Sequence, residues 1–298
     1  MSGEILGDCL QSPFIYPGAS PINLKFDLPG ATMRSIPVEV LRMILDHVDK
    51  ADLVALCQVN KICCSCSQDA LYREIHTDNH RVIRTLAHST DLARRVRSFK
   101  YPHPTSGLST ALKNMSLLRM LDIGWHGLYS SVGTLDECTF KLDSFKCSFY
   151  HGESIRIFLN SQPSLTNLTL WRDREPLPPL EETCLPNLTQ VEADPSSLRK
   201  LIPGRPVWGV TVFHSEFAYD YETEDHEPEA VDYELDFFTL STAPIQKLTI
   251  SYDFLFPKHG SLLASLFPSL EHLTLKFYSR EDFMEWRTVR RSLFCLFI

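Results

Sequence analysis

The chain has 298 residues, of which 44% are apolar and 22% are charged, which is ordinary for a globular protein with a sizeable core. Its formal net charge of −8 argues against a general nucleic-acid binder, because neutralising phosphates requires a surplus of Lys and Arg. The start of the chain has no basic segment followed by a long apolar run, and the nine cysteines are an odd number. These features favour a soluble protein with reduced thiols, in the cytoplasm or the nucleus and without a membrane partner.

The first 33 residues contain four prolines and four glycines and show no sustained hydrophobic period. We therefore expect residues 1–33 to form a flexible leader.

Three short helices are predicted next. "IPVEVLRMILDHV" begins at Ile36 and has the spacing of an amphipathic helix, with Pro37 suited to its first turn. "DKADLVALCQVN" predicts a second helix, and a third should run through a cluster of cysteines to "DALYREI". Three short helices within about forty residues cannot bury all of their apolar side chains, so this module is expected to need a partner.

The cysteine cluster raises the question of a metal site. Cys63, Cys66, His76 and His80 follow a spacing close to that of a Cys2His2 zinc finger. However, nine residues separate the cysteines from the histidines, where about twelve are usual. A redox dithiol would need a strand–turn–helix context that the segment lacks. We favour packing over metal or redox chemistry, and we expect no metal and no cofactor.

The ordered apolar positions of this module resemble an F-box. Ile36-Pro37 stands at the opening Leu-Pro of that family, and Leu71-Tyr72-Arg73 stands at its Leu-Trp-Arg ending. Cys63 departs from the pattern, because the family often has Trp there. The resemblance implies docking on a Skp-type adaptor, and through it on a cullin. The implied adaptor-binding residues are Ile36, Pro37, Val40, Leu41, Ile44, Leu45, Leu53, Leu56, Val59, Leu71 and Tyr72.

The remainder of the chain carries an internal repeat. An L-x-x-L-x-L pattern, with apolar replacements, begins at Val96, Leu118, Leu142, Leu165, Leu188, Val207, Ile245 and Leu270. The starts are 19 to 25 residues apart, except for one interval of 38. That interval contains residues 216–236, which carry ten acidic residues and no Lys or Arg, and which we interpret as an acidic insertion. Four helix-like segments lie between the motifs: "GLSTALKNM", "ESIRIFLNS", "SSLRKLI" and "GSLLASLF".

A strand and a helix at a fixed period predict a curved parallel sheet backed by helices. The array resembles the divergent leucine-rich repeats found behind F-boxes, as in fungal-type F-box proteins. The expected fold is therefore a multidomain α and α/β chain, with an F-box over residues 34–80 and a leucine-rich-repeat-like solenoid over residues 81–298. The apolar ending "LFCLFI" lacks the polar cap that solenoids need, so the C-terminus is expected to be truncated or misjoined.

Alternate residues of the predicted strands should face the concave side, where a target protein would bind. The predicted target-binding residues are Lys100, Asp122, Lys146, Asn167, Trp171, Glu192, Phe213, Lys247 and His272. Trp171 and Phe213 are the expected aromatic anchors, unless they pack under loops.

The resemblance implies the substrate-recognition subunit of an SCF-type (cullin–RING) ubiquitin ligase, which performs no chemistry itself. The alternative is an F-box-like interaction scaffold without a ligase. No nucleophile elbow, zinc-protease motif or phosphate-binding glycine loop supports an enzyme.

Overall fold

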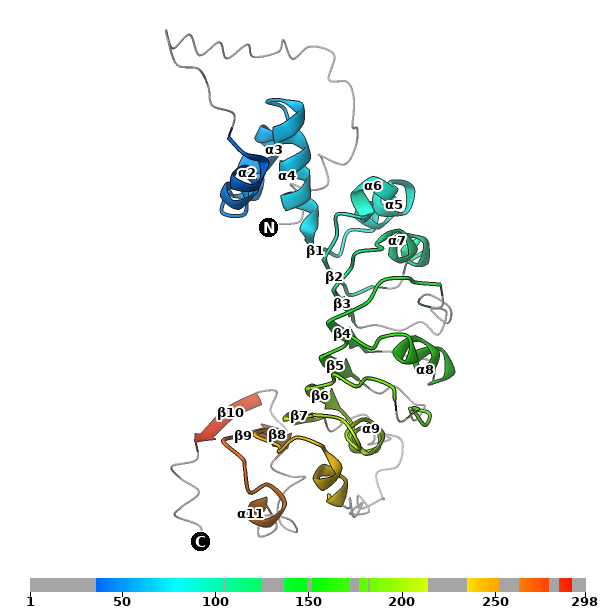
Figure 1. The fold of residues 1–298 in the computed structure, drawn as a ribbon, viewed down its shortest axis with the longest axis vertical. Coiled ribbons are helices and arrows are strands. Elements are labelled where there is room, and N and C mark those ends of the chain that lie inside the picture. Colours follow the sequence, from blue (N-terminus) through cyan, green and yellow to red (C-terminus); the bar gives the residue numbers. More distant parts are fainter. Residues whose placement is uncertain are drawn as a thin grey trace. The chain divides into compact units, whose positions relative to one another are not determined.

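The computed structural model describes residues 36–103, 105–124, 135, 137–148, 152–171, 177–181, 183–213, 235–251, 263–278 and 284–290. It divides into two compact units (Figure 1). The first extends to Leu118, and the second comprises Pro102–Pro104 and the chain from Arg119 onward. The expected leader, almost all of the acidic insertion and the C-terminal "LFCLFI" lie outside the described residues.

The first unit contains the three predicted helices, α2 (Val38–Leu45), α3 (Lys50–Leu56) and α4 (Lys61–Arg73). Asn60 starts α4, because its side-chain oxygen accepts a hydrogen bond from the backbone N–H of Cys63 at 2.8 Å. The chain then passes without a linker into strand β1 (Glu74–His76). The unit is completed by α5 (His80–His88), α6 (Thr90–Ala93), β2 (Ser98–Tyr101) and α7 (Leu108–Asn114), and β2 pairs in parallel with β1.

The second unit is built on a sheet of successive strands. They are β3 (Met120–Ile123), β4 (Ser144–Cys147), β5 (Asn167–Leu170), β6 (Gln190–Ala193), β7 (Gly209–Val212), β8 (Lys247–Ser251) and β9 (His272–Tyr278). Each of these strands pairs in parallel with the next, and β10 (Met284–Arg290) closes the row antiparallel to β9. The helices between them are α8 (Gly152–Asn160), α9 (Pro195–Leu201), the 3-10 helix η2 (Asp236–Leu240) and α11 (Leu263–Leu266).

The strand predictions are confirmed across both units. Each of the eight L-x-x-L-x-L motifs begins two residues before one of the strands β2 to β9. Two of the helix-like segments between the motifs contain α7 and α11, and the other two match α8 and α9 to within one residue at each end. Strands β1 and β10 were not predicted, because neither carries the motif.

The core of the second unit lies on one face of its sheet. Six buried side chains stand in register on neighbouring strands: Phe145, Leu168, Val191, Val210, Leu248 and Leu273. Helices α8 and α9 lie on a common side of the sheet (Figure 1). Phe158 of α8 packs edge-on against Phe145, with ring centroids 5.1 Å apart. The expected alternation of buried and outward side chains is therefore present, and most side chains on the opposite face are exposed or half-buried, Thr249 and Lys276 excepted.

Candidate protein-interaction surfaces

Apolar side chains gather on the outside of the three-helix module. Among the described residues, eleven large apolar side chains are exposed, and seven of these lie between Ile36 and Ile62. The seven, which we call the helical apolar surface, are Ile36, Val38, Val40, Met43, Ile44, Val59 and Ile62. Their concentration in one short segment fits the expectation that this module needs a partner, because clustered exposed apolar residues mark interaction sites.

The residues predicted to bind an adaptor separate into two groups. Ile36, Pro37, Val40, Ile44 and Val59 are exposed, and Leu41 and Leu56 are half-buried. The other predicted residues, Leu45, Leu53, Leu71 and Tyr72, are buried within the unit. In the structure this buried group holds the helices together, and only the first group offers surface to a partner.

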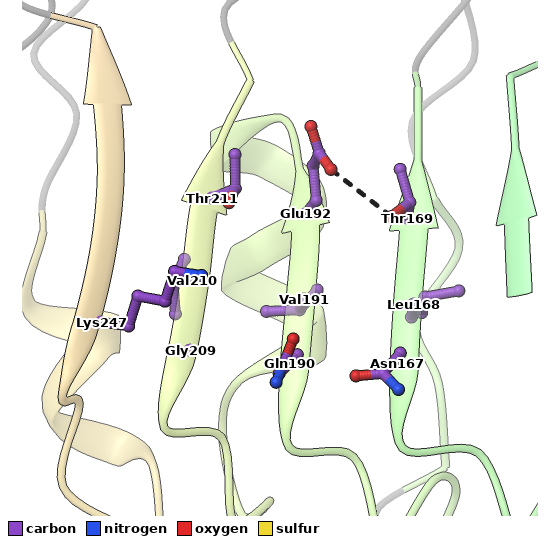
Figure 2. A pocket seen from close by; sticks show the side chains of 10 residues that line it. All are labelled: Asn167, Leu168, Thr169, Gln190, Val191, Glu192, Gly209, Val210, Thr211 and Lys247. Carbon is purple, nitrogen blue, oxygen red and sulfur yellow. Dashed lines mark hydrogen bonds between the residues drawn. The ribbon is translucent and has the colours of Figure 1, made fainter. Parts of the chain in front are cut away.

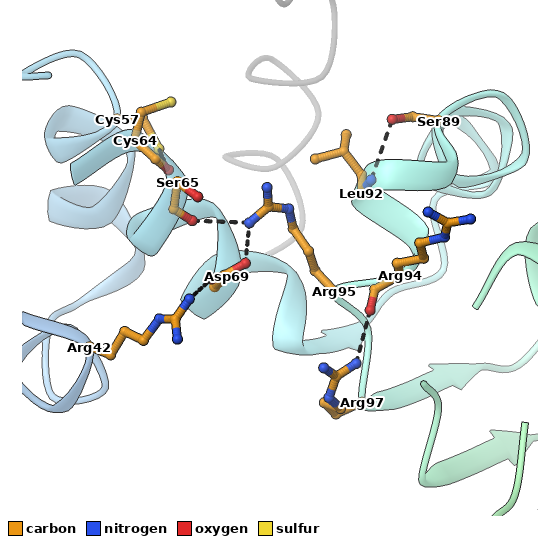
Figure 3. A network of polar contacts seen from close by, with 10 residues as sticks. All are labelled: Arg42, Cys57, Cys64, Ser65, Asp69, Ser89, Leu92, Arg94, Arg95 and Arg97. Atoms are coloured by element: carbon orange, nitrogen blue, oxygen red, sulfur yellow. Dashed lines mark hydrogen bonds and ion pairs between the residues drawn. The ribbon is translucent and has the colours of Figure 1, made fainter. Parts of the chain in front are cut away.

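A polar network joins α4 to its neighbours (Figure 3). Asp69 of α4 accepts a hydrogen bond from Arg42 of α2 at 3.3 Å and another from Arg95, which follows α6. Arg95 also donates to the backbone carbonyl of Ser65 at 3.1 Å. One carboxylate thus ties the first and third helices of the module to the chain beyond α6. Sequence patterns did not point to Asp69, because its partners are 26 and 27 residues away.

The cysteines and histidines of the zinc-finger-like spacing lie on different elements. Cys63 and Cys66 belong to α4, where Cys66 is buried and Cys63 is half-buried. His76 ends β1, and His80 begins α5. Within the described ranges, no group of three or more His, Cys, Asp or Glu side chains could hold a metal ion.

The second candidate surface is the open face, the side of strands β3 to β9 opposite the core. Asp122, Lys146, Asn167, Trp171, Glu192, Phe213, Lys247 and His272, all predicted to bind a target, are exposed or half-buried there. Lys100, the remaining predicted residue, is exposed on β2 in the first unit. Target binding by these residues stays a prediction.

An aromatic and charged cluster lies at the carboxyl ends of the strands on the open face. Trp171 stacks on Phe213 with ring centroids 5.8 Å apart and an interplanar angle of 19°. The ammonium of Lys146 lies 4.2 Å from the centroid of the Trp171 ring, within the range of a cation–π contact. Trp171 and Phe213, the two anchors expected from the sequence, are therefore half-buried and stacked on each other.

A buried cation adds to the charge on this face. Lys276 of β9 is only 8% exposed. Burial lowers the pKa of its ammonium below the usual value, and the negative charge of Glu192 opposes that shift. Glu192 itself accepts a long hydrogen bond from the hydroxyl of Thr169 at 3.5 Å.

A shallow hollow of about 140 Å³ opens between β5 and β8 (Figure 2). Asn167, Gln190, Gly209 and Lys247 occupy one register row across it, and Thr169, Glu192 and Thr211 occupy the next. Gly209 creates the depression, because a Cβ at this position would lie 3.3 Å from Cγ of Gln190. The hollow is partly open and its lining is mixed polar and apolar, which suits a segment of polypeptide better than an enclosed small molecule.

Comparison with known proteins adds one identification. Residues 33–73 match the family model of the F-box domain, the same segment that forms α2, α3 and α4. No curated protein matches the chain. Among the described residues, no helix is long and apolar enough to cross a membrane. The chain therefore carries an F-box domain, a module with an adaptor role in protein interactions.

Proposed function

We propose that this protein is the substrate-recognition subunit of an SCF-type ubiquitin ligase. The observation that carries the proposal is the helical apolar surface, which lies within the matched F-box segment. A Skp-type adaptor would cover Val40, Ile44 and their neighbours, and a cullin would join through the adaptor. Burying these side chains is favourable because each large apolar side chain removed from water contributes about 1.5–3 kcal/mol.

The second unit would hold the target, as a divergent leucine-rich-repeat array. This assignment is supported by the eight motifs that coincide with strands and by the parallel pairing from β3 to β9. The open face would present its polar and aromatic side chains to the target protein. No side chain of this chain would take part in chemistry, and the rate gain would come from holding the target near the conjugating enzyme. The complex would act in the cytoplasm or the nucleus.

Adaptor docking can be tested with two exposed positions of α2. The double variant Val40→Asp and Ile44→Asp places two charges on the helical apolar surface and leaves the buried Leu45 in place. We expect co-purification of the adaptor to fall at least tenfold, because each carboxylate would be desolvated in the interface. A matched control is Ile157→Asp with Leu240→Asp, two apolar positions of similar exposure in the second unit.

Two outcomes would change the assignment. If the Val40 and Ile44 variant retained the adaptor as well as the control does, this docking surface would be ruled out. If the wild-type chain captured the adaptor but no cullin, the scaffold alternative would replace the ligase. A fluorescent fusion of the full chain, imaged in cells, would test the expected compartment.

A further inference from the structure

Two lysines on the open face of the second unit have no carboxylate partner among the described residues. The ammonium of Lys146, on β4, lies over the Trp171 ring. The N–H groups of this ammonium that point away from the ring can donate to an acceptor. Lys247, on β8, is exposed and borders the hollow. A partner that approached this face would meet two cations on strands four places apart in the sheet.

The residues between these lysines are of a different kind. The hollow between β5 and β8 presents the side-chain amides of Asn167 and Gln190 (Figure 2). A primary amide carries a donor and an acceptor, the same pair of groups that an extended peptide backbone presents. The amide of Gln190 makes no side-chain hydrogen bond within the described part of the chain. Gly209 beside it removes the side chain that would otherwise fill the space.

Two acidic side chains, Glu192 and Asp122, limit which peptide residues can bind near Lys146 and Lys247. Glu192 stands near the middle of the face, where it would repel a carboxylate and accept a neutral or basic group. Asp122 stands opposite Lys146 in the register of β3 and β4, so the positive site ends there. From β4 to β8 the charge order is therefore positive, negative, positive, and the buried Lys276 of β9 lies beyond this stretch.

We propose that the open face binds an extended peptide segment of the target that crosses β4 to β8, with acidic residues at Lys146 and Lys247 and a neutral or basic residue over Glu192. The dimensions agree with this pattern. Four strand spacings of about 4.8 Å span about 19 Å, which an extended chain covers in about six residues. This inference rests on the proposed function, since it names the kind of segment that the target presents.

The test uses the full chain, purified without the Skp-type adaptor. The probe is a fluorescein-labelled peptide, Glu-Glu-Ser-Ala-Ser-Gly-Glu-Glu, and binding is followed by fluorescence anisotropy at low and high salt. Two control peptides have the same length: one carries Lys at the four acidic positions, and the other carries its acids in the centre. We expect the acid-ended peptide to bind at least tenfold more tightly than either control, and salt to weaken it.

Four variants address the residues directly. Lys146→Gln and Lys247→Gln should each weaken binding about three- to tenfold, the range for partly exposed charge pairs. Gly209→Val should weaken it without any change of charge, because the new side chain fills the hollow. Glu192→Gln should improve binding of the peptide with central acids. Arg84→Gln, an exposed cation on α5, is the matched control and should leave binding unchanged.

The inference is overturned if the acid-ended peptide does not bind, if the reversed-charge peptide binds equally well, or if both lysine variants bind like wild type. It is also overturned if the peptide binds only after removal of residues 216–234, because the acidic segment of the chain itself would then be the occupant. Adaptor capture is measured on the same preparations. Loss of the adaptor with peptide binding intact would reject the proposed ligase function and leave the peptide site standing.

Discussion

At the residue scale, Arg205 joins several segments of the second unit through its side chain. It is 3% exposed, and its guanidinium donates hydrogen bonds to the backbone carbonyls of Glu181, Cys184, Lys200, Leu201 and Pro203. Burial lowers the pKa of this guanidinium from its usual value, yet the group stays charged because that value is far above neutral pH. Arg205 thus satisfies the last carbonyls of α9 and fixes the chain that leads to β7.

Replacement of this side chain should be costly. The variant Arg205→Met keeps the length and apolar stem but leaves five carbonyl oxygens without their donor. We expect the free energy of unfolding to fall by about 3 kcal/mol or more, since each buried unsatisfied polar group costs about 1–3 kcal/mol. Urea denaturation followed by circular dichroism would measure the change. Arg119→Met, which breaks an exposed ion pair with Asp143 at 3.6 Å, should cost less than about 1 kcal/mol. Equal losses for the two variants would contradict this role of Arg205.

At the element scale, helix α4 is the organising piece of the first unit. It is capped by Asn60, buries Cys66, Leu71 and Tyr72, and continues directly into β1. Asp69 holds its exposed side against Arg42 and Arg95. A helix of 13 residues is marginal by itself, so these contacts rather than helix propensity stabilise it.

The variant Asp69→Asn should loosen α4 without unfolding the chain. Loss of the charge weakens the interactions with both arginines, and we expect a destabilisation of about 1–2 kcal/mol because the carboxylate is only partly buried. Hydrogen–deuterium exchange of the α4 amides should become roughly ten times faster. Asp91→Asn on α6, an exposed carboxylate, is the control and should leave exchange in α4 unchanged. Unchanged exchange in the Asp69 variant would show that apolar packing alone holds the helix.

At the scale of the whole molecule, the first compact unit extends past the F-box match. The match ends at residue 73, whereas the unit runs on to Leu118. The backbone N–H of Arg97 donates to the carbonyl of Arg73, the last matched residue, at 2.8 Å, and the N–H of Thr77, just beyond the match, donates to the carbonyl of Lys100 at 3.1 Å. Ile75 of β1 is buried beside them. The predicted boundary at residue 80 lies seven residues beyond the end of the match and stays a prediction.

Two fragments would measure how far the F-box depends on the elements from β1 to α7. A fragment of residues 33–80 loses the β2 partner of β1 and the Arg95 contacts of α4, while a fragment of residues 33–118 keeps both. We expect the longer fragment to unfold cooperatively on heating and the shorter one to lack a sharp transition, as monitored by circular dichroism. An equally sharp transition at the same temperature for both fragments would show that the F-box folds independently.

The sequence allowed the elements to be predicted better than the surfaces. The L-x-x-L-x-L motif located β2 to β9 because buried and outward residues alternate along each strand, and this alternation is visible in the local sequence. Strands β1 and β10 were missed because neither carries the motif; β1 has only three residues, and β10 departs from the parallel array by pairing antiparallel with β9. The stacking of Trp171 on Phe213 depends on which strands are neighbours, and no local pattern records this. For the same reason the burial of Leu45 and Leu53, which divides the predicted adaptor residues, required the structure.

The alternation of side chains along β3 to β9 has a consequence for how such a protein can evolve. Core residues and open-face residues occupy successive positions of the same strands, yet they contact different surroundings. If the open face binds the target as proposed, a substitution at Lys247 or Gln190 would change what the face recognises and leave the neighbouring Leu248 and Val191 in their packing. On that proposal, single mutations would change the partner without a loss of foldability. Gene copies that diverged from one ancestor could acquire separate targets while retaining a common framework.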